Sequence, residues 1–427
     1  MNRQIARLAF PALMTLAADP LVSLIDTAFV GRLGTTSLAA LGINTAIFSV
    51  AFIGFNFLAY GTTPLVARAW GQRDAGRAAR TITQALGLAI GLGVLAAAVL
   101  FFGSKRWLAL LQTPAAAYEE ALTYLRIRAL AAPAVLIITA SNGAFRGRQD
   151  TITPLRVTVW LNVLNTGGDA LLIFGLGWGI AGAATATVIA QWFGALWFLR
   201  LLAPDWVGMK AARRDELMTF LSAGWAIVIR TGALLAALTA ATASAARIGT
   251  PAVAAHQIVM QIWLLLALLV DSLAVAGQAI VGRLLGEGNE TVVPATVRQL
   301  TMWGLLVGTF LAGALLLVGA LLEPIFGVTR EVAELAKGII PFVAAVQPLG
   351  GVLFVGDGVF LGASRFRFLA GTSLVAGFGS IGVIWLLDGT RTDLLGVWLG
   401  IGTLLILRLI PQVVSFARHG TVSARER

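Results

Sequence analysis

Twelve long, continuous runs of apolar residues dominate this sequence, and they constrain its fold more than any other feature. A helix of about 20 apolar residues crosses the hydrocarbon core of a bilayer, where only helices and closed barrels satisfy their own backbone hydrogen bonds. Barrel strands would alternate in hydrophobicity, so we predict an all-α polytopic membrane protein. Its helices are expected over residues 7–30, 44–67, 81–102, 120–142, 156–174, 178–200, 217–245, 254–282, 298–322, 336–362, 368–387 and 394–416.

The sequence also repeats itself imperfectly at an offset of 215 residues. Arg32-Leu33-Gly34-Thr35 returns as Arg247-Ile248-Gly249-Thr250, and residues 142–147 return as residues 357–362. Two related helix bundles are typical of transporters that rock around a central site. We therefore predict two pseudo-symmetric six-helix lobes around a central cavity. The predicted bounds are 1–203 for the N-terminal lobe, 204–216 for a cytoplasmic linker and 217–427 for the C-terminal lobe.

The charged residues predict the orientation and the partners. The formal net charge is +11, although only 12% of the residues are charged. Most Lys and Arg residues, Arg408 among them, fall in segments that are cytoplasmic if both termini are, as the positive-inside rule requires. No soluble domain is left to carry a basic and aromatic patch, so nucleic acid is not an expected partner. The excess of Arg over Lys, with abundant Ala and Gly, suggests a prokaryotic protein, which we place in the inner cell membrane.

Polar residues inside the apolar runs of the first lobe suggest a cation site, because a charge at membrane depth is expensive unless it is functional or paired. Asp26 lies in the first helix, Asn165 and Asp169 lie one turn apart in the fifth, and Ala183 and Thr187 lie one turn apart in the sixth. All five fall at one depth. Oxygen ligands of this kind suit Na⁺, and a close carboxylate pair suits a proton because both acids cannot ionise together. The alternative is that these residues only hold helices together.

The second lobe does not repeat this set. The 215-residue offset carries the three polar positions onto Ala241, Ser380 and Ile384. Instead, Arg230, Asp271 and Asp357 lie within its apolar runs, and Arg230 must keep its charge and should pair with an acid. These residues, with Asp19 in the first helix, are candidates for substrate binding or gating. An internal salt bridge that stabilises the lobe is the alternative.

Two prolines lie in the first helix. Pro11 and Pro20 each remove one backbone hydrogen bond, so each can act as a hinge or form a static kink.

Several segments together are similar to the multidrug and toxin extrusion (MATE) family, most closely to its DinF-like branch. They are Pro11, residues 26–34, 38–42 and 143–151, and the Asn165/Asp169 pair. The resemblance implies two six-helix lobes that export drug-like compounds in exchange for Na⁺ or H⁺. By this resemblance, the family's first-lobe cation site corresponds to Asp26, Asn165, Asp169, Ala183 and Thr187. The family's helix-bending proline corresponds to Pro11. In the family's second-lobe Na⁺ site only Asp357 finds a match, since the seventh helix offers Arg230 where a glutamate is expected.

We therefore predict a cation-coupled antiporter, with H⁺ favoured over Na⁺, that exports cationic or amphipathic small molecules by alternating access. The acidic excess among the intramembrane charges favours cationic cargo. We expect no enzymatic activity, no cofactor beyond the coupling ion, and a monomer in the lipid bilayer. A flippase for lipids or lipid-linked substrates is the main alternative, and a channel is the second.

Overall fold

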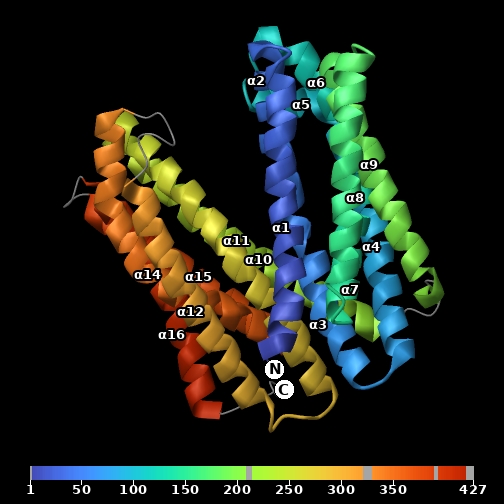
Figure 1. Ribbon diagram of the computed structural model, residues 1–427, viewed down its shortest axis with the longest axis vertical. Helices are drawn as coiled ribbons and strands as arrows, with labels where there is room; N and C mark the ends of the chain where they lie inside the picture. The colour runs from blue at the N-terminus through green and yellow to red at the C-terminus, as the bar shows by residue number, and fades with distance from the viewer. Residues whose placement is uncertain (1, 208–213, 321–328, 389–392, 420–427) are drawn as a thin grey trace. The chain divides into compact units, whose positions relative to one another are not determined.

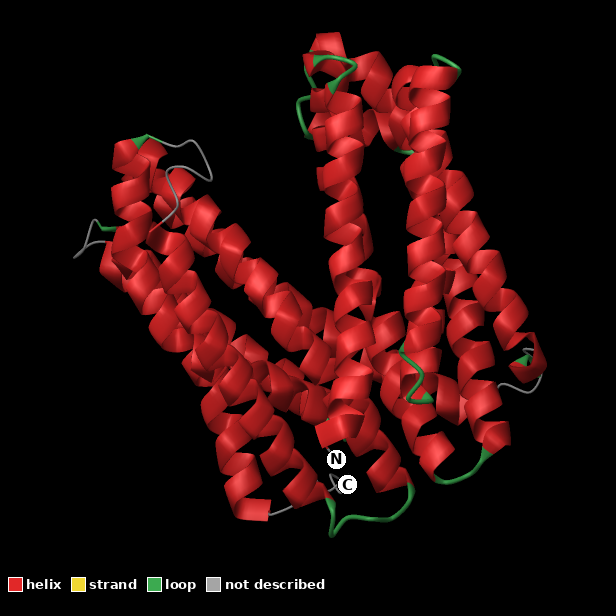
Figure 2. Ribbon diagram, in the orientation of Figure 1, coloured by secondary structure: helices red, strands yellow, loops and turns green. Residues whose placement is uncertain are grey.

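The computed structural model describes residues 2–207, 214–320, 329–388 and 393–419. Within these ranges the chain is helical and contains no strand, and its helices are joined by short loops (Figure 2). This confirms the predicted all-α class. Each predicted span overlaps one or more helices in the described ranges, whereas residues 208–213 of the predicted linker and residues 321–322 of the ninth predicted span lie outside them.

The helices of the first half are labelled in Figure 1. They are α1 (Asn2–Gly31), α2 (Thr35–Ile53), α3 (Phe57–Gly71), α4 (Ala75–Phe102), α5 (Ser104–Leu110), α6 (Ala115–Ala129), α7 (Ala132–Gly147), α8 (Ile152–Asp169) and α9 (Gly179–Leu202). The second half comprises α10 (Arg214–Ile248), α11 (Thr250–Gly286), α12 (Val293–Ala320), α14 (Arg330–Gly362), α15 (Phe366–Asp388) and α16 (Leu394–His419). In the described part of the chain, 11 helices are long and apolar enough to cross a membrane, and the total is 12 if the bent α6–α7 pair is one span.

The fourth predicted span, 120–142, is this broken helix. α6 and α7 meet at an angle of 48°. Pro133 lies in the first turn of α7, where its missing N–H leaves no hydrogen bond unmade and where it favours the start of a new helix. Gly93 of α4 packs against this break, because a Cβ at Gly93 would lie 2.4 Å from Cα of Pro133. The apolar run alone did not reveal the bend.

The sequence repeat is also present in the backbone. Three pairs of positions at the 215-residue offset adopt positive φ angles at equivalent turns. The pairs are Gly34 (131°) with Gly249 (148°), Arg73 (56°) with Gly288 (73°), and Gln149 (60°) with Ser364 (60°). Corresponding turns therefore separate corresponding helices, which supports the predicted pseudo-symmetric halves.

Close helix packing explains why residues 142–147 and 357–362 resemble each other. A Cβ at Gly143 would lie 2.8 Å from the carbonyl oxygen of Ala59 in α3, and one at Gly358 would lie 2.2 Å from that of Ala274 in α11. The offset relates Gly143 to Gly358 and Ala59 to Ala274. Small residues let membrane helices approach at backbone distance, so this part of the repeat maintains the α3–α7 and α11–α14 contacts.

The chain divides into two compact units by its internal contacts. One comprises Phe10–Gly224, and the other comprises Trp225–Arg427 with the residues up to Ala9. The first turns of α1 thus pack with the second unit, where the Asn2 side-chain oxygen accepts hydrogen bonds from Gln299 and, at 3.0 Å, from Trp303 of α12. The boundary falls within α1, next to Pro11.

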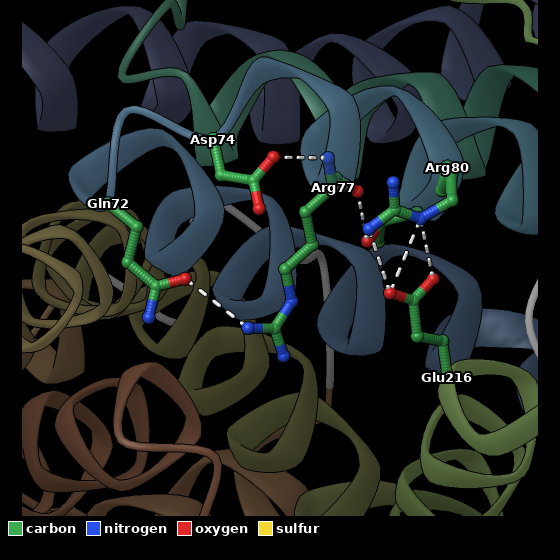
Figure 3. Close-up of polar contacts among 6 residues, drawn as sticks. Gln72, Asp74, Arg77, Arg80 and Glu216 are labelled. Atoms are coloured by element: carbon green, nitrogen blue, oxygen red, sulfur yellow. Dashed lines mark hydrogen bonds and ion pairs between the residues drawn. The ribbon is translucent and has the colours of Figure 1, made fainter.

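A polar cluster holds the beginning of α10 within the first unit (Figure 3). The carboxylate of Asp74 caps α4 by accepting the backbone N–H of Arg77 at 2.8 Å. One turn later, Arg80 forms an ion pair with Glu216 of α10 at 3.1 Å. A second ion pair, Arg148 with Asp205 at 2.6 Å, holds the segment that follows α9.

Candidate functional site: a carboxylate pair in the first unit

The predicted cation-site residues of α1 and α8 converge on one amide group. Nδ2 of Asn165 donates to Oδ1 of Asp26 at 3.1 Å and to Oδ2 of Asp169 at 2.8 Å. Asn165 and Asp169 are 2% and 0% exposed, and Asp26 is half-buried. Because the spacing of four places Asn165 and Asp169 on one face of α8, one side chain can bridge both acids.

Asp169 is the last residue of α8 and precedes a π-helical turn at Ala170–Gly175. Its second oxygen, Oδ1, is buried and has no hydrogen-bond donor among the described residues. A buried carboxylate oxygen without a partner is unfavourable. A proton or a small cation at this oxygen would satisfy it. Single π-turns inside helices are frequent at functional sites.

The α9 residues of the predicted site lie in the same unit. The hydroxyl of Thr187 donates to the carbonyl of Ala183 at 2.9 Å. Thr187 also lines a cavity of about 230 Å³ together with Asp26 and Asn165. The structure thus brings Thr187 to the two helices that carry the acids, while the Ala183 carbonyl is occupied by the Thr187 hydroxyl.

Arg128 of α6 lines this cavity too, and the sequence analysis assigned it no role. Its guanidinium lies 5.1 Å from the centre of the Phe48 ring, and it interacts electrostatically with both Asp26 and Asp169. The signal that could have identified it is the one that identified the acids, a charge inside an apolar run. A fixed positive charge therefore accompanies the carboxylate pair.

Asp19 lines the cavity as well, seven residues before Asp26 on α1. Its side chain is exposed, and Arg146 of α7 interacts with it electrostatically. The spacing of seven places Asp19 and Asp26 on one face of α1, and both line this cavity. The cavity combines exposed and half-buried acids with a cation, and its polar lining also includes Asn162 of α8 and Gln191 of α9.

In the second unit, Asp357 forms the centre of a buried ionic cluster. Its Oδ2 accepts from Arg230 of α10 at 2.5 Å and from Arg408 of α16, and its Oδ1 accepts from Gln412 at 2.7 Å. Asp357 and Arg408 are both 3% exposed. Asp271 of α11 interacts electrostatically with Arg408. The ion pair expected for Arg230 is therefore present.

The prediction that Arg408 lies in a cytoplasmic segment is wrong, because Arg408 is buried within α16. Its guanidinium is buried because Asp357 provides a carboxylate within the bundle, a contact that no spacing along the chain indicates.

Both predicted hinge residues lie inside α1, which is one continuous helix (Figure 1). Pro11 is buried and Pro20 is exposed. The Pro11 carbonyl accepts the hydroxyl of Thr15 at 2.9 Å. Pro20 directly follows Asp19, so a cavity-lining acid adjoins one of the two weak points of the helix backbone.

No cluster of three or more His, Cys, Asp or Glu side chains that could hold a metal ion occurs in the described part of the chain. The site itself offers a carboxylate pair, a bridging amide and a nearby arginine.

The family model described as MatE matches residues 11–171 and 221–385. The chain belongs to this family. Its members are multidrug efflux transporters rather than enzymes, so the chain is a transporter of this class.

Two curated relatives are similar to the chain over most of its length, and one solved structure shares its fold. The Arabidopsis thaliana "Protein DETOXIFICATION 44, chloroplastic" is 36% identical over 96% of this chain and 81% of its own length. The Escherichia coli "DNA damage-inducible protein F" is 27% identical over 98% of this chain and 92% of its own. These matches confirm the predicted family and its DinF-like relatives.

The solved structure is an outward-facing conformation of a multidrug resistance MATE family transporter. It superimposes with a TM-score of 0.87 at 21% identity and covers 99% of this chain and 96% of its own. The fold of the family is therefore shared.

Proposed function

We propose that this transporter is a cation-coupled antiporter that exports cationic or amphipathic small molecules, and that its coupling ion is H⁺ held at Asp26 and Asp169. The observation that carries the proposal is the shared Asn165 amide, which brings two acids from different helices together and leaves a buried Asp169 oxygen without a donor. Such a pair can take up and release one proton without dismantling the site.

Two features support H⁺ over Na⁺. A Na⁺ ion needs several oxygen ligands, but the Asn165 amide presents its nitrogen to both acids, and the Ala183 carbonyl already accepts the Thr187 hydroxyl. A proton requires only the carboxylate oxygens themselves.

The cavity supports cationic cargo. Asp19 and Asp26 both line it, and protonation of the acid pair would remove negative charge from its wall. Proton and cationic substrate then compete for the same charge, which is the differential binding that exchange requires. We further propose that α1, which carries Asp19, Asp26 and both prolines, bends between the two states of an alternating-access cycle.

The remaining parts of the proposal concern the setting of the protein. We place both termini in the cytoplasm, on the distribution of the arginines. We further propose that the protein is a monomer in a prokaryotic cell membrane. The chloroplastic name of one relative belongs to that relative. The efflux family does not favour the lipid-flippase alternative.

The test is efflux of a cationic dye from proteoliposomes under separately imposed pH and Na⁺ gradients. Wild type should respond to the pH gradient, and Asp169→Asn should abolish that response while leaving dye binding measurable. Glu119→Gln, which neutralises an exposed acid of α6, is the matched control and should behave as wild type. Efflux driven by Na⁺ alone would contradict proton coupling, and pH-driven efflux by the Asp169 variant would move coupling to another site.

A further inference from the structure

A second cavity, of about 400 Å³, lies entirely within the second unit between α12, α14 and α16. Its walls are mainly aliphatic and include Val297, Val352, Leu409 and Val413. Val413 is 50% exposed, so the cavity opens on the surface of a membrane-spanning helix. Its volume is within the range of pockets that hold small organic ligands.

The equivalent positions of the first unit are filled. At the 215-residue offset, Val413 corresponds to Phe198, which is 0% exposed, and Val297 corresponds to Ile82, which is 1% exposed. The cavity of the second unit thus arises from its own side chains, chiefly the shorter Val413, and not from the architecture that the two units share.

The residues that line the cavity also differ in charge from the residues at the equivalent positions of the first unit. Arg298 on α12 lines it and is exposed, whereas the corresponding Thr83 is buried and accepts the backbone N–H of Val207 at 3.2 Å. No acidic side chain among the described residues pairs with Arg298. An unpaired cation beside an aliphatic cavity at the surface of a membrane helix is complementary to a molecule with an anionic head and an apolar chain.

A further polar group points to a ligand. Gln412 lines the cavity and is 1% exposed. Its amide nitrogen donates to Asp357, but its side-chain oxygen has no donor among the described residues. A headgroup hydroxyl could provide that donor. Such an occupant would lie one side chain away from the Asp357 cluster.

We propose that this cavity binds an acidic phospholipid of the surrounding bilayer, with the acyl chain against the valines and the phosphate at Arg298. This inference does not depend on the proposed coupling mechanism. Lipid tails are as apolar as the cavity wall, so leaving the bilayer for the cavity gains little for the chain. Selectivity must come from the headgroup, at about the fivefold that corresponds to ~1 kcal/mol for one basic residue near an anionic headgroup.

The experiment titrates delipidated, full-length protein with phosphatidylglycerol or phosphatidylcholine of identical acyl chains, and counts bound lipids by native mass spectrometry. Wild type should bind one phosphatidylglycerol about fivefold more tightly than phosphatidylcholine, and Arg298→Gln should reduce this ratio to near one. Arg367→Gln removes an exposed arginine from α15, outside the cavity, and should retain the ratio.

Val413→Phe introduces the ring that the first unit carries at Phe198 and should weaken binding of both lipids. Equal binding of the two lipids to wild type would overturn the proposal, and so would a ratio that survives Arg298→Gln. Displacement of phosphatidylglycerol by an equal concentration of palmitate would show that a free fatty acid, and not a phospholipid, is the occupant. Because Arg298 is exposed, its variant should fold, which keeps the test valid even if the phenylalanine variant does not.

Discussion

Replacing Asp357 by alanine tests whether the ionic cluster of the second unit is a structural element. The carboxylate accepts hydrogen bonds from Arg230, Arg408 and Gln412, and its side chain and that of Arg408 are each 4% exposed. The substitution leaves two guanidinium groups side by side in the bundle without the carboxylate that they share. Removing one partner of a buried ion pair destabilises a protein by about 3–5 kcal/mol. We expect a value at the upper end, since this one carboxylate accepts hydrogen bonds from both arginines.

Removing one of the two arginines instead of the carboxylate should cost little stability. Arg230→Met leaves Asp357 paired with Arg408 as a one-to-one ion pair, and the methionine retains much of the packing of the arginine stem. We therefore expect Arg230→Met to destabilise by about 1 kcal/mol or less, in the range of a partly compensated pair. Asp357→Ala should therefore destabilise the protein more than Arg230→Met does, because the carboxylate accepts from both arginines.

The assay is unfolding of the purified transporter in mixed micelles with increasing SDS, followed by tryptophan fluorescence. Glu331→Gln on the same helix α14 is the control, because Glu331 is exposed in the first turn and its loss should cost less than about 1 kcal/mol. If Asp357→Ala were no more destabilising than this control, the cluster would not stabilise the unit. If Asp357→Ala folded normally but lost dye efflux, the cluster would have a transport role instead.

Three further variants test other parts of the molecule. Arg128→Gln should move the pH profile of efflux toward alkaline pH by about 1 to 2 pH units, because the lost positive charge favours ionised carboxylates; an unchanged profile would remove Arg128 from the site. Gly358→Leu should destabilise by about 1–3 kcal/mol or more, since even its Cβ would lie 2.2 Å from the Ala274 carbonyl, whereas Gly371→Ala, with nothing within 4 Å, should be neutral in the same unfolding assay. Pro11→Ala should favour a straight α1 by ~3 kcal/mol, about 100-fold in population, and slow efflux without weakening dye binding; wild-type efflux rates would exclude the hinge.

The membrane spans and the repeat were predictable from sequence because both are properties of the chain read in order. A run of about 20 apolar residues crosses a bilayer as a helix whatever its neighbours are. A repeated block keeps its local conformation, as the positive φ angles of Gly34 and Gly249 show. The bend between α6 and α7 was missed because apolar residues continue through it, and only Pro133 in the first turn of α7 marks the break.

The acids of the candidate site were predictable in kind but not in arrangement. Charges are rare in membrane helices, so Asp26 and Asp169 stood out, and the spacing of four placed Asn165 beside Asp169. The amide bridge to Asp26 joins residues 139 positions apart, and the presence of Arg128 depends on how α6 packs beside α2 and α9. Hydropathy ranks residues one at a time and carries no information about such pairs.

Arg408 shows most clearly what the sequence indicates and what only the tertiary structure decides. By sequence alone it was a basic residue near the end of a helix, of the kind that usually faces the cytoplasm. In the folded unit it is buried, because α14 brings Asp357 against it and the carboxylate offsets the desolvation of the guanidinium. The sequence by itself determined which segments are apolar enough to cross the membrane and in which order they follow one another. Only the tertiary structure decided which charges meet between them, since the partners come from helices that are distant along the chain.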